Sequence, residues 1–394
     1  MRREGLVPIV VAVLLSGLSI YLHFVGGTSL TQEADIWDKR VQLHREYYPL
    51  SRRCFTTQSL SFLHDTFEIP YRDAFIMLQY GLCLLLSAAF YVFLRELGFT
   101  RFKANVGLAL LLSSYPILCA HFQPVHTWDD FWQYLGSVVA LLLAFRGKLL
   151  LSAFVLSVAC VARESTLLIY PAYLLVVLSQ RQLNTWSRTM AALLPLAISF
   201  VYLVFTFRPP DPVRFHNFDK NFMDPTWASH TVFSLLVSFG SLWLTSLLGL
   251  IVAGRSLVSD WRSSVVVLGA VYLVPTVVVS TLTLALARET RLFFPPFLFL
   301  IPLTLWFWEQ MASHLRTFYT RWFGIPGILL LAVSIMGGIL AAESLFPTFD
   351  FRAWPGFAQT YLGIHIGISI SISVPLVLVV AQRCRCTLQK RPEA

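Results

Sequence analysis

The segment from Thr28 to Asp73 is the first long polar stretch of the chain, and it reads TSLTQEADIWDKRVQLHREYYPLSRRCFTTQSLSFLHDTFEIPYRD. It lies between two apolar runs, at about 6–25 and 74–94, each near the roughly 20 residues that a helix needs to cross a bilayer. Its opening is acidic, with Glu33 and Asp35 only a few residues beyond the first run. Carboxylates held near a membrane surface can act as bases or metal ligands, or they can simply solvate a turn. We therefore expect a polar loop between two membrane helices, and any chemistry to use this loop.

The whole chain has the composition of a helical membrane protein. Its 394 residues are 56% hydrophobic and only 13% charged, and the mean hydropathy is +0.67. Runs such as SVVVLGAVYLVPTVVVSTLTLAL, at 264–286, are apolar on every face, whereas the strands of a membrane barrel alternate apolar and polar residues. The composition therefore predicts an all-α polytopic membrane protein.

Basic residues set the expected orientation. Arg2 and Arg3 precede the first apolar run, and Lys and Arg gather in alternate connections, as the positive-inside rule describes for cytoplasmic segments. This pattern predicts about 12 membrane segments, with both termini in the cytoplasm and the 28–73 loop outside. The formal charge of +9 is then a topology signal. No basic tail, zinc-finger spacing or RNA-binding motif points to nucleic acid.

We divide the chain into a transmembrane module at 1–208, which includes the external loop, and C-terminal transmembrane helices at 209–394 without a separate soluble domain. The expected location is the inner membrane of a bacterial cell envelope. Most of the acidic residues fall in the segments assigned to the outside. A transporter would more often place its polar groups at the bilayer midplane. The position of the acidic residues at one surface therefore favours a membrane protein other than a transporter.

Two arginine motifs stand at the expected external ends of helices. Arg163-Glu164 interrupts the apolar stretch 149–179, which is too long for one span, so we expect two short helices that meet at 162–165. The second motif is Arg288-Glu289-Thr290-Arg291. An arginine near membrane depth can bind a phosphate through its planar fork, and the adjacent Glu could hold the guanidinium in place. The alternative is an internal Arg–Glu pair that locks two helices together.

A further group of polar residues lies in HFQPVHTWDDFW, at 121–132, where His126, Asp129 and Asp130 stand at the mouth of a helix. Imidazole and carboxylate are ordinary metal ligands, but the spacing matches no recognised metal signature. We therefore expect these side chains to position a substrate by hydrogen bonds, with a metal site as the less favoured alternative. Trp37 lies beside the acidic start of the first loop, where its ring could pack against a sugar or anchor the chain at the interface.

These features together resemble the GT-C superfamily of membrane glycosyltransferases, which take sugars from polyprenyl-phosphate donors. The resemblance rests on the acidic start of the first external loop and on five motifs, which are ADIWDKRVQLHREYY, TQSLSFLHDTF, ARESTLLIYP, HTWDD and RETRLFFPP. It implies a GT-C-like fold with juxtamembrane helices in that loop. In this family an Asp or Glu of the first external loop is the catalytic base, and the matching position here is Asp35, with Glu33 as the alternate.

The resemblance implies inverting transfer of a sugar from a polyprenyl phosphate to a hydroxyl acceptor at the extracytoplasmic face. Asp35 would accept the hydroxyl proton. Arg163, Arg288 and Arg291 would bind the lipid phosphate and stabilise the charge on the leaving group. The chain lacks the large C-terminal soluble domain of oligosaccharyltransferase-like members, so a glycan, a lipid and a protein all remain open as acceptors. No cofactor is expected. A non-catalytic membrane scaffold or assembly subunit is the main alternative, and a lipid or solute transporter is the third.

Overall fold

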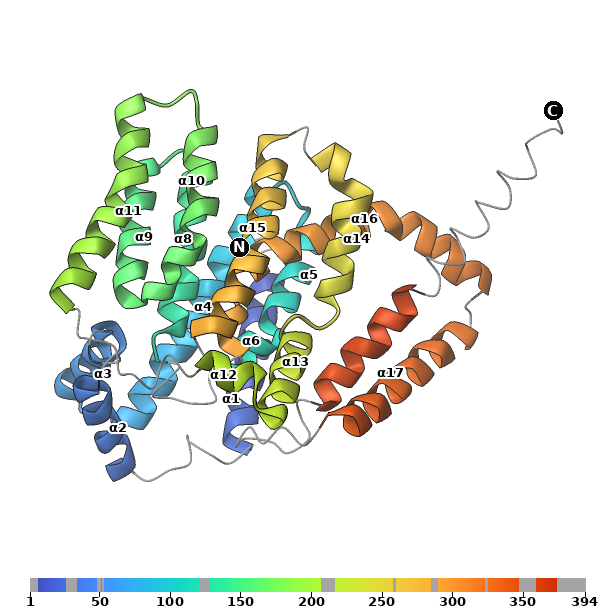
Figure 1. Cartoon of the computed structure of the whole chain (residues 1–394), viewed down its shortest axis with the longest axis horizontal. Coiled ribbons are helices and arrows are strands. Elements are labelled where there is room, and N and C mark those ends of the chain that lie inside the picture. The colour runs from blue at the N-terminus through green and yellow to red at the C-terminus, as the bar shows by residue number, and fades with distance from the viewer. Residues whose placement is uncertain are drawn as a thin grey trace. The chain divides into compact units, whose positions relative to one another are not determined.

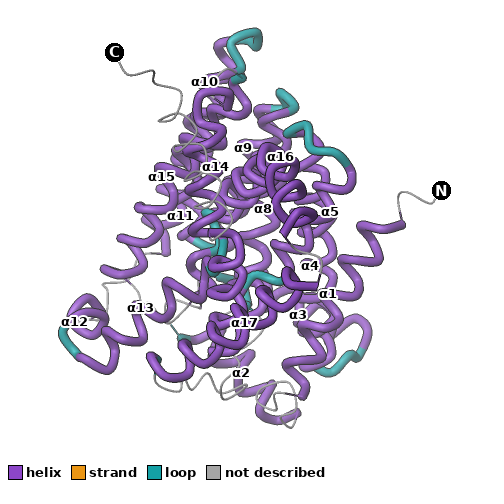
Figure 2. The backbone as a smooth tube through the Cα atoms, turned by 90° about the vertical axis from the view of Figure 1, so that its right-hand side faces the viewer, coloured by secondary structure: helices purple, strands orange, loops and turns teal. Residues whose placement is uncertain are grey.

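The computed structural model describes ten stretches of the chain, which are 6–25, 34–47, 51, 53–120, 128–206, 217–257, 260–284, 290–322, 325–346 and 359–373. Within them the secondary structure is helical, and none of these residues forms a strand (Figures 1 and 2). This confirms the all-α class that the composition predicts.

The chain forms two compact units, Met1–Ser238 with Gly254–Pro302 and Phe239–Ala253 with Leu303–Ala394. The helices up to the second polar loop are α1 (Leu6–Val25), α2 (Ala34–Glu46), α3 (Cys54–Phe67), α4 (Tyr71–Glu96), α5 (Arg101–Leu112), α6 (Tyr115–Cys119), α8 (Asp130–Phe145), α9 (Leu149–Ala162), the 3₁₀ helix η3 (Glu164–Ile169), α10 (Tyr170–Ser179) and α11 (Thr185–Thr206). The later ones are α12 (Asn217–Phe222), α13 (Pro225–Phe239), α14 (Leu242–Leu257), α15 (Trp261–Leu284), η5 (Thr290–Phe293), α16 (Phe297–Trp322), α17 (Ile325–Leu345) and a helix at 359–373. The division expected after residue 208 falls in a segment outside the described residues and stays a prediction.

The two helices expected within the first polar loop are present as α2 and α3. The core of the first unit is a set of helices in which α8 packs against α4 and α9, and α9 also packs against α11. Small residues allow the α8–α9 approach, because a Cβ added at Gly136 would lie 2.5 Å from the Cβ of Ala159. Ser152 of α9 also donates a hydrogen bond to the carbonyl oxygen of Ala140 in α8, at 2.5 Å.

The apolar stretch 149–179 is broken where the sequence predicts. Helix α9 ends at Ala162, and Arg163 is extended, with φ −155° and ψ 121°. The Thr166 hydroxyl donates to the carbonyl oxygen of Ala159 at 2.9 Å, which also accepts a backbone hydrogen bond from the N–H of Arg163. The chain continues through η3 into α10, whose first turn contains Pro171. The expectation of two short helices meeting at 162–165 is therefore confirmed.

Three described helices are long and apolar enough to cross a membrane, namely Tyr71–Glu96, Thr185–Thr206 and Trp261–Thr283. The bent pair Ala228–Phe239 and Leu242–Ile251 would add a fourth. The expected number of about 12 segments is not reached by this criterion. Helix length explains much of the difference, because α8, α9 and α10 have 16, 14 and 10 residues, fewer than the roughly 20 of a full span.

Helix α11 supports the membrane interpretation through its exposed side chains. Phe200 and Phe205 are 68% and 85% exposed, and Leu193, Val201 and Val204 are also more than half exposed. A soluble protein rarely leaves such a contiguous apolar surface in water, whereas lipid covers it without cost.

In the second unit, α17 and the 359–373 helix lie side by side (Figure 1) and approach closely through glycines. A Cβ added at Gly363 would lie 2.4 Å from the Cα of Ile339, and one at Gly367 would lie 2.5 Å from the Cα of Ile335. Gly363 and Gly367 are four residues apart, which is the small-xxx-small pattern that brings two membrane helices into backbone contact.

We predict that Gly363→Ala lowers the thermal stability of the purified protein in detergent, because the new methyl group has no room against α17. Overpacking of this kind typically costs about 1–3 kcal/mol. Gly337→Ala is the matched control, since a Cβ there would meet nothing within 4 Å and alanine favours a helix by about 0.5–1 kcal/mol. A melting temperature of Gly363→Ala equal to that of the wild type would contradict the close crossing.

Candidate functional site

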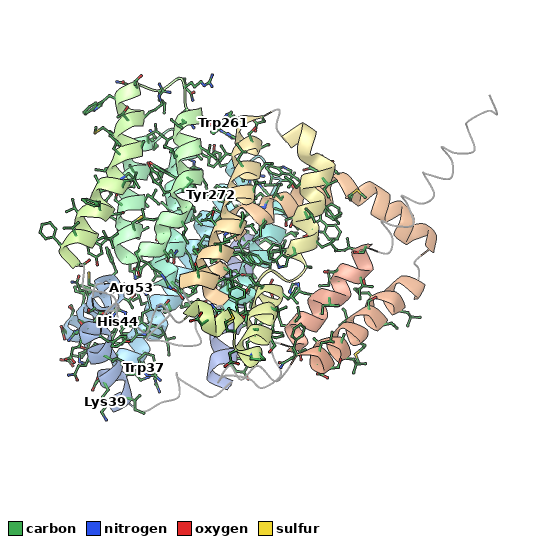
Figure 3. The ribbon with its side chains drawn as sticks, in the orientation of Figure 1. Trp37, Lys39, His44, Arg53, Trp261 and Tyr272 are labelled. Atoms are coloured by element: carbon green, nitrogen blue, oxygen red, sulfur yellow. The ribbon has the colours of Figure 1, made fainter. Side chains whose placement is uncertain are left out.

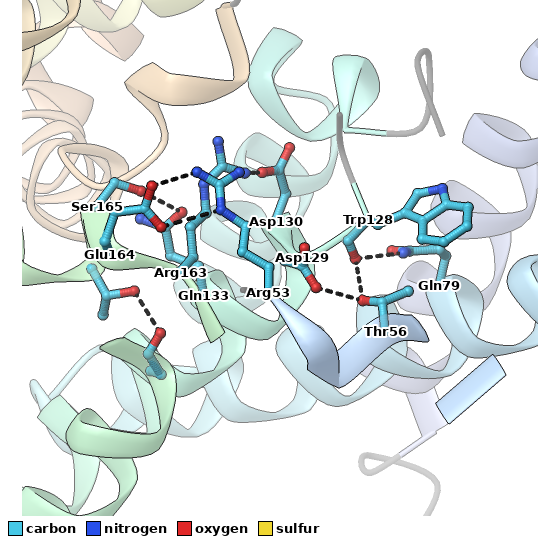
Figure 4. A network of polar contacts seen from close by, with 12 residues as sticks. Arg53, Thr56, Gln79, Trp128, Asp129, Asp130, Gln133, Arg163, Glu164 and Ser165 are labelled. Carbon is cyan, nitrogen blue, oxygen red and sulfur yellow. Dashed lines mark hydrogen bonds and ion pairs between the residues drawn. The ribbon is translucent and has the colours of Figure 1, made fainter. Parts of the chain in front are cut away.

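The polar residues of the first loop meet two helix ends in one buried network. Its members come from α2, from the start of α3, from the residues that open α8, and from the α9–η3 break. Figure 4 shows the part of the network that lies outside α2. Figure 3 shows that Trp37 and His44 lie on α2 and that Arg53 lies just before α3. Residues more than 100 positions apart are therefore brought together.

His44 is the centre of one half of this network. Its Nε2 lies 3.2 Å from Asp129 Oδ2, and its Nδ1 lies 2.7 Å from the Thr57 hydroxyl. The imidazole also stacks on the indole of Trp128, with ring centroids 4.7 Å apart. An ionised carboxylate only accepts hydrogen bonds, so the Nε2–H donates to Asp129. His44 thus joins α2, α3 and the start of α8 through side chains that are all buried.

Helices α3 and α4 also bind the Trp128–Asp129 segment. The Thr56 hydroxyl lies 2.7 Å from the Trp128 carbonyl oxygen and 2.9 Å from Asp129 Oδ1. The amide of Gln79 in α4 donates to the same Trp128 carbonyl at 2.9 Å. The peptide that opens α8 therefore has a fixed position, and both carboxylate oxygens of Asp129 have partners.

The adjacent Arg163 and Glu164 form ion pairs with two different segments. Glu164 accepts two hydrogen bonds from Arg53, at 3.1 Å from Nε and 2.5 Å from Nη2. The Arg163 guanidinium pairs instead with Asp130 at the start of α8, and both side chains are almost fully buried. These partners differ from the adjacent Arg163–Glu164 pair that the sequence suggests. The extended backbone at Arg163 directs the two neighbouring side chains to opposite partners.

A further bond joins the break to α8, because the Ser165 hydroxyl donates to Gln133 Oε1 at 3.2 Å. The start of α8 and the α9–η3 break are therefore connected by both an ion pair and a hydrogen bond. The Arg163–Asp130 pair joins two helices, but its carboxylate is an Asp of α8 rather than the Glu of the Arg–Glu pair that the sequence left open.

Trp37 is buried, whereas the sequence suggests a position at the surface. Its ring is fully buried, lies 5.2 Å from the ring of Phe75 in α4, and belongs to a core cluster with Val41, Leu60, Ala74 and Trp128. Trp37, Val41 and His44 recur at helical spacing on one face of α2, and that face is buried against the rest of the unit. A sugar has no access to the Trp37 ring in this arrangement.

The remaining candidates are only partly located. Asp35 lies in the first turn of α2 and Arg291 lies in η5, but their side chains are outside the described part of the structure. Glu33, His126, Arg288 and Glu289 lie wholly outside it. The roles expected of these six residues stay predictions.

Asp129 and Asp130 bind different partners, His44 and Thr56 for Asp129 and Arg163 for Asp130, and their carboxylates do not converge on a shared site. Among the residues described, no group of three or more His, Cys, Asp or Glu side chains is arranged to hold a metal ion. The functional candidates that sequence reasoning did not single out are His44, Arg53, Thr56, Thr57 and Gln79. The one local signal for them is the helical spacing of Trp37, Val41 and His44, because their partners lie far away in the chain.

We predict that Asp130→Asn destabilises the protein more than Glu164→Gln does. Removing the charge of Asp130 leaves the buried Arg163 without its counter-ion, which typically costs about 3–5 kcal/mol. The Arg53–Glu164 pair is more exposed, at 13% and 29% of the side chains, so its loss should cost about 1 kcal/mol or less. Thermal unfolding in detergent measures both values.

The double variant Asp130→Asn with Arg163→Gln is the control, because it removes both buried charges together. It should recover part of the stability that Asp130→Asn loses. Equal melting temperatures for Asp130→Asn and Glu164→Gln would contradict the assignment of Asp130–Arg163 as the buried pair.

We compared the chain with known proteins to ask whether a relative has such a network. No protein-family model matches it, and searches of the curated proteins and of the solved structures likewise find no match.

Proposed function

We propose that the protein is a membrane glycosyltransferase that moves a sugar from a polyprenyl phosphate to a hydroxyl acceptor. The observation that carries the proposal is the convergence of the first polar loop with two helix ends. Asp129 and Asp130 open α8, Arg163 and Glu164 stand at the α9–η3 break, and both ends contact the loop or each other. A polar network beside apolar helices suits a reaction that joins a lipid-borne donor to a water-soluble acceptor.

In this proposal Asp35 is the general base, with Glu33 as the alternate. Asp35 stands in the first turn of α2, and the other end of that helix is fixed through His44 to Asp129 and Thr57. A catalytic group works best on a rigid element whose own contacts are satisfied. The buried contacts of α2 would therefore give the base a defined position at the membrane surface.

Arg163 has a supporting role here. Its charge is already balanced by Asp130, so it has less to offer to a lipid phosphate than an arginine without a counter-ion. Arg288 and Arg291 remain the proposed phosphate ligands. The GT-C-like arrangement and the external position of the loop belong to the same proposal, and they rest on the motifs and charge pattern of the sequence.

A non-catalytic membrane scaffold is the second candidate, and one observation favours it. The ion pairs Arg53–Glu164 and Arg163–Asp130, with the His44–Asp129 contact, tie three segments together and occupy the charges that a substrate would otherwise use. A scaffold would retain this network for stability alone.

Asp35→Asn should separate the two candidates. The substitution nearly keeps the shape of the side chain but removes the basic carboxylate, and general-base catalysis typically contributes about 100- to 10,000-fold. We expect the variant to express and insert normally while sugar transfer from polyprenyl-phosphate donors falls by at least about 100-fold.

Glu33→Gln is the matched control in the same acidic cluster, and it should keep most of the activity. If Glu33→Gln is inactive and Asp35→Asn transfers at the wild-type rate, the base is Glu33. If both variants transfer normally, the proposed site is wrong. Absence of transfer by the wild-type protein across the polyprenyl-phosphate sugars tested would favour the scaffold.

In the proposed topology the protein lies in a bacterial inner membrane with both termini in the cytoplasm. Cys54, at the start of α3, should then react with a membrane-impermeant maleimide added outside the cell, whereas Cys384 and Cys386 should not. Burial raises the pKa of the Cys54 thiol; a backbone hydrogen bond lowers it and the negative charge of Asp129 raises it further.

Because the thiolate is the reactive form, labelling of Cys54 should be slow at neutral pH and keep accelerating above about pH 8.5, where an ordinary thiol is half ionised. A variant with Cys54→Ala gives the background. Labelling of the two tail cysteines in intact cells would overturn the orientation.

A further inference from the structure

Four helix connections meet at one end of the first unit and form one surface. Glu96, in the last turn of α4, accepts a hydrogen bond from Arg146 of the α8–α9 turn at 3.1 Å and pairs with Arg262 of α15 at 3.2 Å. The side-chain amide of Gln180, which follows α10, donates to the carbonyl oxygen of Ala144 in α8 at 3.1 Å. The α4–α5, α8–α9 and α10–α11 turns and the start of α15 are therefore held together.

This surface is rich in basic residues. We define the basic surface as residues 95–103, 146–148, 180–188 and 260–262. It contains eight Lys or Arg residues and two acidic ones, Glu96 and Asp260. Glu96 already has two basic partners, and Asp260 accepts a hydrogen bond from a backbone N–H in the first turn of α15. Lys148 and Arg181 are exposed. The residues of the basic surface therefore carry a clear excess of positive charge.

Exposed aromatic and apolar side chains accompany the basic ones. Within the basic surface, Phe102 is 77% exposed and Trp186 is 64% exposed. Next to it along the chain, Leu151 and Phe154 of α9 and Leu178 of α10 are more than half exposed. Aromatic and basic side chains beside an apolar belt are typical of the level at which the headgroups of a bilayer meet its hydrocarbon. A partner confined to water would leave these apolar side chains uncovered.

The basic surface lies far from the buried network of the candidate site. Helix α9 separates them, because Lys148 precedes its first residue and Arg163 follows its last. A helix of 14 residues is about 21 Å long. Figure 3 shows the separation, with Trp261 near the top of the view and Trp37 and Lys39 at its lower left. The two regions can therefore be tested independently.

We propose that the basic surface binds the headgroups of anionic phospholipids. The headgroup supplies the negative charge, Lys and Arg donate charge-assisted hydrogen bonds to it, and the acyl chains cover the neighbouring apolar side chains. An anionic lipid thus matches both the charge of the surface and its apolar border, whereas a soluble polyanion matches the charge alone. The inference requires no sugar transfer and goes beyond the proposed function.

Trp186 provides a local reporter of the bound lipid. The purified protein is reconstituted in vesicles of phosphatidylcholine with a minor share of phosphatidylglycerol, and the acyl chains of one lipid or the other are brominated, because bromine quenches an indole on contact. The Trp186 signal is the difference between proteins without and with Trp186→Phe. We expect quenching by phosphatidylglycerol to exceed its share of the lipid, and to fall as NaCl rises, because salt screens exposed charges.

Lys148→Gln combined with Arg181→Gln should reduce the relative affinity for phosphatidylglycerol at least about fivefold, since each Lys or Arg near an anionic membrane contributes about that factor. Lys39→Gln combined with Arg45→Gln is the matched control, because it removes two exposed positive charges from α2. The control should stay within about twofold of the wild type, since salt screens charges far from Trp186. Both double variants replace exposed side chains, so both should fold.

Quenching of Trp186 in proportion to the share of each lipid would overturn the proposal. Equal loss of preference in the two double variants would also overturn it, since that result would reflect general charge attraction. Absence of quenching by either brominated lipid would contradict it and favour a soluble anionic partner. Phosphatidylglycerol is present in both leaflets of these vesicles, so the result does not depend on the orientation of the protein. Failure here is therefore distinguishable from labelling of the tail cysteines and from the outcome for Asp35→Asn.

Discussion

Two neighbouring carboxylates at the start of α8 must be compensated where almost no water reaches them, and the arrangement of the first unit follows from how this is achieved. Asp129 and Asp130 are 2% and 1% exposed. An ionised carboxylate at such a site is strongly destabilising unless it is paired and hydrogen-bonded. Asp129 takes its partners from α2 and α3, and Asp130 takes Arg163 from the α9–η3 break. Each carboxylate therefore fixes a different segment against α8.

The apolar helices around this network face a different constraint. Between helices in lipid there is little hydrophobic driving force, so association depends on close packing and on polar contacts. Gly136 against Ala159 in the first unit and Gly363 against Ile339 in the second show the packing. The polar contacts concentrate at the ends of α8 and α9, where short helices of 16 and 14 residues leave charged groups in reach of one another.

Local features of the fold could be predicted from the sequence, and long-range ones could not. The helices α1, α2 and α3 and the break at Arg163 follow from apolar length, polar composition and a charged interruption, which are all properties of neighbouring residues. The number of membrane-length helices is overestimated, because hydropathy alone does not show where a helix ends, as at α8 with its 16 residues. The burial of Trp37 was missed for a related reason, since an aromatic residue in a polar stretch has no local sign of the surface that covers it.

The pairing of charges within the candidate site was also beyond the sequence. Arg163 and Glu164 are adjacent, so a mutual interaction was the simplest expectation, but their partners Asp130 and Arg53 lie 33 and 111 positions away. This exchange of partners changes what the site can bind. Arg53 and Arg163 are neutralised by carboxylates. An anionic ligand is attracted to uncompensated charge rather than to arginine as a residue type. Arg163 is therefore engaged within the protein and has less to offer a phosphate than the sequence alone suggests.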